Sequence, residues 1–155
     1  MITGKFVTDK EKLDLAGMLR AEIFQGRYVT DSFPCPDARY AVLWVDGVPA
    51  GMGGIRCIND RSTIIEIGIL EDHRRQSYGD LLLRLMASPA IDQDIRKIYV
   101  EATEDSKDFF SATHFHPEDE RPYGYTGQER FPMVLELRDL RCACSKDRSS
   151  PYKPF

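Results

Sequence analysis

The sequence predicts a mixed α/β fold, in which helices pack on a central, mostly antiparallel sheet. Three observations lead to this prediction. Residues 40–70 read as consecutive strands joined by short turns, which makes those strands antiparallel. Residues 77–88 have the spacing of an amphipathic helix, and residues 95–102 read as a strand after it. A strand that follows a crossover helix lies parallel to the strand before that helix, so the sheet is mixed.

The N-terminal segment predicts a strand followed by a helix. Residues 2–8 are short and β-prone, and Asp9 is a candidate N-cap. Residues 11–24 repeat apolar side chains at helical spacing, and Gly26 is a suitable stop. Residues 28–37 contain two prolines and therefore read as a loop.

A β-meander is predicted in the middle of the chain. Strands over residues 40–45 and 48–58 flank Asp46-Gly47, a strong hairpin signal. A second turn leads to another strand over residues 63–70. The three glycines inside residues 48–58 indicate a bulge or the close approach of another backbone.

The C-terminal half predicts shorter elements. The amphipathic helix is expected to end at Pro89, because proline removes a backbone donor from a helix interior. Residues 106–113 read as a short helix. Residues 131–137 read as the last strand, paired in a hairpin with the segment around Phe115 or Tyr123.

Length and composition are those of a single globular domain. The chain has 155 residues and a net charge of -4. We expect one domain over residues 1–140 and a basic, aperiodic tail over residues 141–155. The lack of a long basic run argues against nucleic-acid binding, and no segment approaches the about 20 apolar residues of a membrane helix. The N-terminus has no signal-peptide pattern, so we expect a cytoplasmic protein with reduced cysteines.

The cysteines and histidines do not predict a metal site. Cys142 and Cys144 are separated by one residue, whereas zinc-binding cysteine pairs usually have about two to four residues between them. His114 and His116 precede an acidic stretch that reads as a polar surface loop. We therefore expect no metal.

The segment over residues 66–83 carries the strongest chemical signal, because it reads as a strand, a polar loop and a helix start. A loop that opens into a helix N-terminus presents free N–H groups, which bind phosphate. Arg74 and Arg75 add positive charge, and the small residues Ser77 and Gly79 allow a ligand to approach the backbone. The alternative is an ordinary solvated loop with Asp80 complementing the helix dipole.

The same segment resembles a known family. Arg74-Arg75-Gln76-Ser77-Tyr78-Gly79 is similar to the central motif of the GNAT superfamily of acyltransferases, with Ser77 at the position of the first glycine. The segment over residues 109–115 resembles a later motif of the same family, and the first helix and the hairpin agree with its element order. The resemblance covers residues 1–137. It implies a three-layer fold whose sheet is splayed between strand 63–70 and strand 95–102.

The resemblance also implies a site for acetyl-CoA. In the family, backbone amides of the central loop hold the diphosphate, and the first of the two splayed strands pairs with the pantetheine arm. Carried over to this chain, the cofactor residues are Ile67, Ile69, Leu70, Arg74, Arg75, Gln76, Ser77, Tyr78, Gly79, Asp80 and Phe110.

The catalytic candidates are less well defined by the sequence. Acyl transfer requires a neutral amine, so a base or a water relay must remove a proton. Glu66 is the first candidate and Glu101 the second, although Glu66 could instead face solvent or pair with Arg56. Phe110 stands where many members have a tyrosine that protonates the leaving thiolate. We expect Tyr123, Tyr125 or solvent to replace it, or the thiolate to leave unassisted.

Together these features predict an N-acetyltransferase. It would transfer an acetyl group from acetyl-CoA directly to a primary amine of a small molecule or protein, and the family-level expectation is a homodimer. The alternative is a catalytically silent CoA-binding or interaction module, suggested by Ser77 and Phe110. His114, at the position of a family glycine, predicts a left-handed residue after the short helix.

Overall fold

A computed structural model describes residues 1–25, 33–59, 61–118, 123–125 and 128–140, with the side chains of residues 123–125 and 128–129 left out. The strands and helices follow one another in the order that the sequence predicts, mostly with shifts of one to three residues at their ends. The elements are β1 (Ile2–Val7), α1 (Lys10–Phe24), β2 (Ala38–Val45), β3 (Val48–Ile58), β4 (Arg61–Ile69), η1 (Glu71–His73), α2 (Tyr78–Asp92), β5 (Lys97–Ala102), α3 (Lys107–Ala112), β6 (His116–Pro117), β7 (Tyr123–Tyr125) and β8 (Gln128–Glu136).

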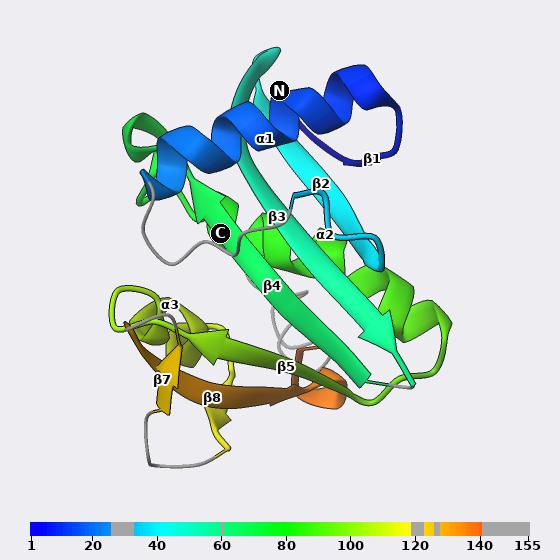
Figure 1. Cartoon of the computed structure of the whole chain (residues 1–155), viewed down its shortest axis with the longest axis vertical. Helices are drawn as coiled ribbons and strands as arrows, with labels where there is room; N and C mark the ends of the chain where they lie inside the picture. Colours follow the sequence, from blue (N-terminus) through cyan, green and yellow to red (C-terminus); the bar gives the residue numbers. More distant parts are fainter. Residues whose placement is uncertain (26–32, 60, 119–122, 126–127, 141–155) are drawn as a thin grey trace, which may run out of the picture.

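The strands form one mixed sheet in the order β1-β2-β3-β4-β5-β8-β6, and β7 pairs with β8. Every described pair is antiparallel except β4 with β5, which the crossover helix α2 makes parallel. The described β4–β5 ladder covers only Ser62–Ile64 against Ile98–Val100. Beyond it the strands separate, so the splayed sheet expected from the resemblance is confirmed (Figure 1).

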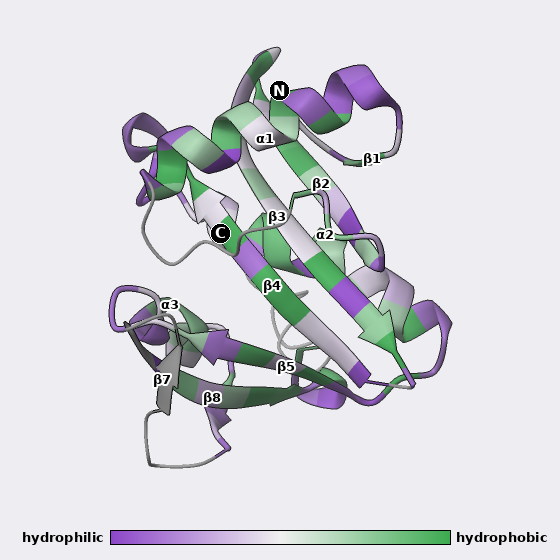
Figure 2. Cartoon of the chain, viewed as in Figure 1, coloured by the Kyte–Doolittle hydropathy of each residue, from purple (hydrophilic) through white to green (hydrophobic). Residues whose placement is uncertain are grey.

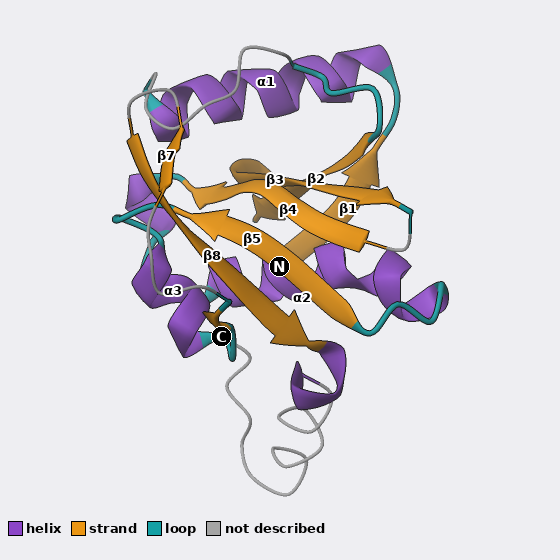
Figure 3. Ribbon diagram, turned by 60° about the horizontal axis from the view of Figure 1, so that its bottom comes forward, coloured by secondary structure: helices purple, strands orange, loops and turns teal. Residues whose placement is uncertain are grey.

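Helices cover the sheet in three layers. Helix α1 lies on one face, and α2 and α3 lie on the other (Figure 3). Apolar residues run along the central strands, whereas hydrophilic residues gather on the first turns of α1 and in the loops (Figure 2). The core on the α2 face is built around Leu82, Leu83 and Met86, and the core on the α1 face around Leu19 and Ile23.

The β2–β3 hairpin follows the chemistry of its turn. Asp46 and Gly47 both have positive φ values, 52° and 80°, as a two-residue turn between twisted strands requires. Gly53 of β3 lies against Met86 of α2, where a Cβ atom would collide with the methionine sulfur. The close approach at Gly53 is thus that of a side chain rather than of another backbone. The predicted bulge is present, because the β3–β4 register shifts between Gly54 and Ile55.

Pro89 does not end the amphipathic helix, so that prediction is wrong. Helix α2 continues to Asp92 with the proline inside it. A proline cannot donate to the carbonyl four residues before it, here that of Leu85. The Ser88 hydroxyl instead donates to the Leu85 carbonyl oxygen at 2.7 Å, which satisfies that acceptor.

The ends of α1 and the pairing of the last strand can also be compared with the predictions. Asp9 is the N-cap of α1 without a side-chain capping bond, and α1 ends with Gln25 in the left-handed conformation; the predicted stop at Gly26 lies outside the described residues. Both partners expected for the last strand are used, because β6 and β7 each pair with β8. The tail over residues 141–155, with its two cysteines, also lies outside the described residues. No helix in the described ranges is long and apolar enough to cross a membrane.

Candidate active site

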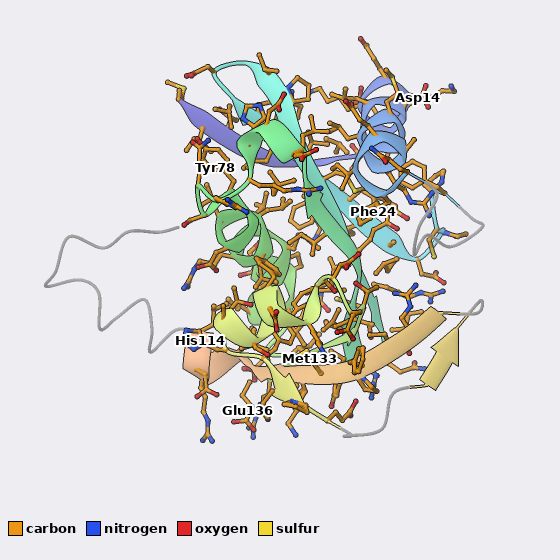
Figure 4. All side chains as sticks on the ribbon, turned by 90° about the vertical axis from the view of Figure 1, so that its left-hand side faces the viewer. Asp14, Phe24, Tyr78, His114, Met133 and Glu136 are labelled. Carbon is orange, nitrogen blue, oxygen red and sulfur yellow. The ribbon has the colours of Figure 1, made fainter. Side chains whose placement is uncertain are left out.

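A pocket of about 830 Å³ lies where β4 and β5 separate. Its walls come from the last turn of α1, the end of β4, the loop into α2, and the segment from β5 into α3. Figure 4 views the molecule from this side, with Tyr78 of α2 and Phe24 of α1 on opposite sides of the opening. The lining residues are Ile23, Phe24, Ile67, Gly68, Ile69, His73, Arg74, Arg75, Ser77, Tyr78, Gly79, Asp80, Thr103, Asp105, Ser106, Phe109, Ala112 and Thr113.

The loop into α2 lines one end of this pocket. Arg75 and Ser77 are both left-handed, with φ of 66° and 64°. Among the described residues, no carbonyl accepts the N–H groups of residues 75–80, and the first backbone bond of the helix runs from Leu81 N–H to the Ser77 carbonyl. Free amides at the positive end of a helix form an anion-binding site.

The arginines of the loop have different surroundings. The Arg74 Nε atom donates to the Ile69 carbonyl oxygen at 2.9 Å, so this side chain folds back over the end of β4. Both Arg74 and Arg75 line the pocket and are exposed. Their charges therefore reinforce the attraction of the free amides for an anion.

Most predicted cofactor residues meet at this pocket, but three do not line it. Gln76 is exposed, and its side-chain oxygen accepts a hydrogen bond from the Tyr78 hydroxyl at 3.1 Å. Leu70 packs in the core on the α1 face. Phe110 is 2% exposed and stacks edge-on against Phe109 and Phe115. Its neighbour Phe109 lines the pocket instead.

The ring of Phe109 leaves no room for a side chain at Gly79. A Cβ atom on Gly79 would lie 2.8 Å from the Phe109 Cε1 atom, too close without movement of the ring. The glycine therefore lets an aromatic side chain from α3 approach the first turn of α2. This contact draws the two sides of the pocket together at the end where the free amides lie.

Ser77 and His114 hold left-handed conformations where the family has glycines, and His114 has the φ of 80° expected after the short helix. An L-residue in this region costs about 1–2 kcal/mol. We therefore expect Ser77→Gly to raise the free energy of unfolding by about 0.5–1 kcal/mol, after allowing for the flexibility of glycine in the unfolded chain. Chemical denaturation measures this change. Ser111→Gly, in the interior of α3, should destabilise the protein, and a destabilising Ser77→Gly would show that the serine side chain makes a needed contact.

Asp80 introduces an acidic group into the same pocket. Burial raises the pKa of Asp80 to about 6, although Arg84 and His114 favour its charged form. The Asp80 Oδ1 atom lies 3.6 Å from the Arg84 Nε atom. Above pH 6 the carboxylate is charged and would repel a bound phosphate group.

We therefore expect the affinity for acetyl-CoA to fall about three- to tenfold between pH 5.5 and pH 8, because the neutral form of Asp80 is lost over that range. Calorimetric titration at several pH values checks this expectation. Asp80→Asn should remove this part of the pH dependence. A curve that is the same in the variant would show that Asp80 is not near the ligand.

A β-bulge in β4 determines where Glu66 points. The β3–β4 register shifts between Gly54, opposite Glu66, and Ile55, opposite Ile64. Ile64 belongs to the core on the α2 face, so regular alternation would place Glu66 on that face too. The extra residue reverses the alternation, and Glu66 faces α1.

Glu66 is held there by an arginine of α1. The Arg20 Nε atom donates to Glu66 Oε2 at 2.6 Å, and the two side chains are only 14% and 6% exposed. The predicted alternative partner, Arg56, lies opposite Thr63 instead. Burial raises the pKa of Glu66, while the charge and hydrogen bond of Arg20 oppose that rise.

The other catalytic candidates lie on the far half of the sheet. Glu101 of β5 is exposed and lines a smaller pocket of about 450 Å³, together with Arg61, Thr63, Tyr99, Val100, Glu118 and Pro132. The backbone of Tyr123 lies in β7 opposite Arg130, and its side chain is outside the described part. Glu66 and Glu101 therefore do not share one pocket.

Several pocket residues were missed by the sequence analysis. Thr103 and Ser106 exchange hydrogen bonds before α3: each backbone N–H donates to the other side-chain oxygen, at 2.8 and 3.1 Å. Threonine and serine side chains often form such local bonds to nearby backbone N–H groups, but the spacing alone did not mark these two residues as part of a pocket. Ile23 and Phe24 carry no comparable signal, because apolar residues in a last helical turn usually belong to the core. No group of three or more metal-ligating side chains is found in the described ranges.

The fold and the pocket have the arrangement expected of the GNAT acyltransferase family. A family model described as the acetyltransferase (GNAT) family matches residues 9–116, and the chain belongs to this family. A Bacillus subtilis (strain 168) protein, provisionally named a [ribosomal protein bS18]-alanine N-acetyltransferase, is 31% identical over 96 residues. The match covers 59% of this chain and 64% of that relative, slightly less than two thirds of its length.

Solved structures show the same fold. The ribosomal-protein-S18-alanine N-acetyltransferase from Escherichia coli superposes with a TM-score of 0.72 at 17% identity, over 88% of this chain and 94% of that one. N-acetylglutamate synthase from Neisseria gonorrhoeae, solved with coenzyme A and N-acetyl-glutamate, gives a TM-score of 0.70 at 16% identity, over 88% of this chain and 35% of that one.

Proposed function

We propose that this chain is an N-acetyltransferase that transfers an acetyl group from acetyl-CoA to a primary amine in a ternary complex. The observation that carries this proposal is the pocket between β4 and β5, with free amides and two arginines at one end and an unpaired strand edge beside it. Family membership supports the reaction class.

In this proposal the loop binds the diphosphate and β4 binds the pantetheine arm. The N–H groups of residues 75–80 donate to the phosphate oxygens, and Arg74 and Arg75 add positive charge. The edge of β4 near Ile67 and Ile69 has lost its β5 partner, so it can pair with the amide groups of the arm. Release of the Ile69 carbonyl by Arg74 would free one further acceptor for that pairing.

The amine would approach from the α1 face of the sheet, opposite to the face that α2 covers. Ile98 and Val100 of β5 belong to the core on the α2 face, so Tyr99 and Glu101 point to the other face. The Glu101 side chain is exposed, whereas Glu66 is only 6% exposed and lies 2.6 Å from the Arg20 Nε atom. This contrast favours Glu101 as the group that accepts the proton from the attacking amine, directly or through water.

The amine nitrogen would then attack the thioester carbonyl carbon, and the C–S bond would break as the thiolate leaves. Phe110 cannot supply a proton to that thiolate, so a tyrosine of β7 or solvent would do so. The names of the relatives make a peptide with an N-terminal alanine the first acceptor to test, followed by small amines.

Release of the coenzyme A thiol in the presence of each amine tests the proposal. With an active acceptor, Glu101→Gln should lower kcat by about 100-fold or more and leave the Kd for acetyl-CoA unchanged. Glu66→Gln should have a smaller effect on kcat if Glu66 acts only through its pair with Arg20. Glu104→Gln, an exposed glutamate paired with Lys107, is the matched control.

The alternative function predicts a different pattern. A silent CoA-binding module would bind acetyl-CoA but release no thiol with any amine in the panel, and none of the three glutamine variants would then have a measurable effect. Equal loss of kcat in Glu66→Gln and Glu101→Gln would assign the base to both positions or to water held between them.

A further inference from the structure

The pocket has a polar end and an apolar end. Free amides, Arg74 and Arg75 form the polar end at the start of α2. At the other end, Ile23 and Phe24 of α1 face Gly68 of β4. We call Ile23 and Phe24 the α1 wall. Both ends line one continuous pocket, so a ligand bound by its phosphates at the first end extends toward the second.

The α1 wall is packed tightly against β4. A Cβ atom on Gly68 would lie 2.5 Å from the Ile23 Cγ2 atom and 3.2 Å from the Phe24 Cζ atom. There is therefore no spare volume between these side chains and the strand, even for one methyl group. Ile23 is also part of the buried core on the α1 face, so it cannot move aside without disturbing that core.

The position of the wall is fixed by the buried ion pair. Arg20 lies three residues before Ile23 and four residues before Phe24. All three side chains are therefore on the same side of α1, one helical turn apart. Its bond to Glu66 ties α1 to β4 two residues before Gly68. The ion pair thus holds the last turn of α1 against the strand that borders the pocket.

We propose that the α1 wall sets the length of the acyl chain, so that the protein accepts acetyl and propionyl thioesters and excludes medium and long chains. This inference rests on the proposed function. With the diphosphate at the free amides and the arm along β4, the thioester lies near Gly68. An acyl group of two or three carbons fits before the wall, whereas a longer chain would collide with Phe24.

Binding of coenzyme A, acetyl-CoA, butyryl-CoA and octanoyl-CoA tests this inference without a known acceptor. The Kd values are measured by calorimetry below the concentration at which octanoyl-CoA forms micelles. The wild-type protein should bind octanoyl-CoA at least tenfold more weakly than acetyl-CoA. Phe24→Ala should bring the two Kd values within threefold of each other through a gain of affinity for octanoyl-CoA, which unfolding cannot produce.

Met18→Ala is the matched control, because Met18 lies on α1 but is 70% exposed. It should leave the ratio of Kd values unchanged. Phe24→Leu, which keeps an apolar side chain, should give an intermediate ratio. Equal affinity of the wild type for acetyl-CoA and octanoyl-CoA, or an unchanged ratio in Phe24→Ala, would overturn the role of the wall. Failure of coenzyme A itself to bind would overturn the proposed function and this inference with it.

Discussion

Gly79→Asp is expected to lower the affinity for acetyl-CoA by at least 100-fold, which corresponds to about 2.7 kcal/mol. Two effects add. The new side chain must displace the Phe109 ring, because its Cβ atom would lie 2.8 Å from Phe109 Cε1. Its carboxylate also places negative charge beside the free amides of the α2 N-terminus, where a phosphate is expected to bind. Calorimetry with acetyl-CoA measures the loss.

Two variants separate these effects from general damage. Gly79→Ala adds the steric change without the charge and should lose about tenfold. Gly47→Asp makes the same substitution in the β2–β3 turn, where an added Cβ atom meets no atom within 4 Å, and should bind acetyl-CoA as the wild type does. An unchanged Kd in Gly79→Asp, with thermal unfolding intact, would remove the start of α2 from the binding site.

Arg20→Ala is expected to lower the free energy of unfolding by about 3–5 kcal/mol, because it leaves the Glu66 carboxylate buried without its partner. The effect should depend on pH. Burial already raises the pKa of Glu66 in the folded state, and loss of Arg20 removes the main opposing cause, so the pKa rises further. A raised carboxyl pKa gives stability that is full at low pH and is lost as pH rises through the folded value.

The destabilisation by Arg20→Ala should therefore be larger at pH 8 than at pH 4.5, as denaturant titrations at the two pH values would show. Replacing both partners, Arg20→Met with Glu66→Leu, should recover most of the lost stability, because an apolar pair leaves no buried charge. Arg56→Ala, at an exposed arginine of β3, should change stability by less than about 0.5 kcal/mol. A small and pH-independent effect of Arg20→Ala would mean that water reaches Glu66.

Local signals in the sequence predicted most of the fold. Asp46-Gly47 identified the β2–β3 hairpin because both residues tolerate positive φ, and the apolar spacing after Ser77 identified α2. The spacing could not show that Pro89 stays inside that helix, because the compensating bond from Ser88 depends on a rotamer. Proline alone is the stronger signal for a helix end, so the prediction followed the usual rule.

The site was predicted in part, and its limits have physical causes. The loop motif located the free amides because a strand–loop–helix joint determines backbone direction. The orientation of Glu66 depends on the bulge at Ile65, and a single extra residue in a ladder leaves no mark in the sequence. The choice between Phe109 and Phe110 depends on how α3 is rotated against α2. Pairing of Glu66 with Arg20 requires the packing of α1 on the sheet, which only the tertiary structure provides.

The short β4–β5 ladder has a consequence for the way the protein unfolds. Three residue pairs give the backbone few shared hydrogen bonds between the β1–β4 half and the β5–β8 half. Side chains of α2 make up for this, because the core around Leu82 and Met86 contains Ile55 and Ile64 from one half and Ile98 and Leu135 from the other. Cooperative unfolding of the two halves therefore depends on this helix, and weakening its packing would let one half open while the other stays folded.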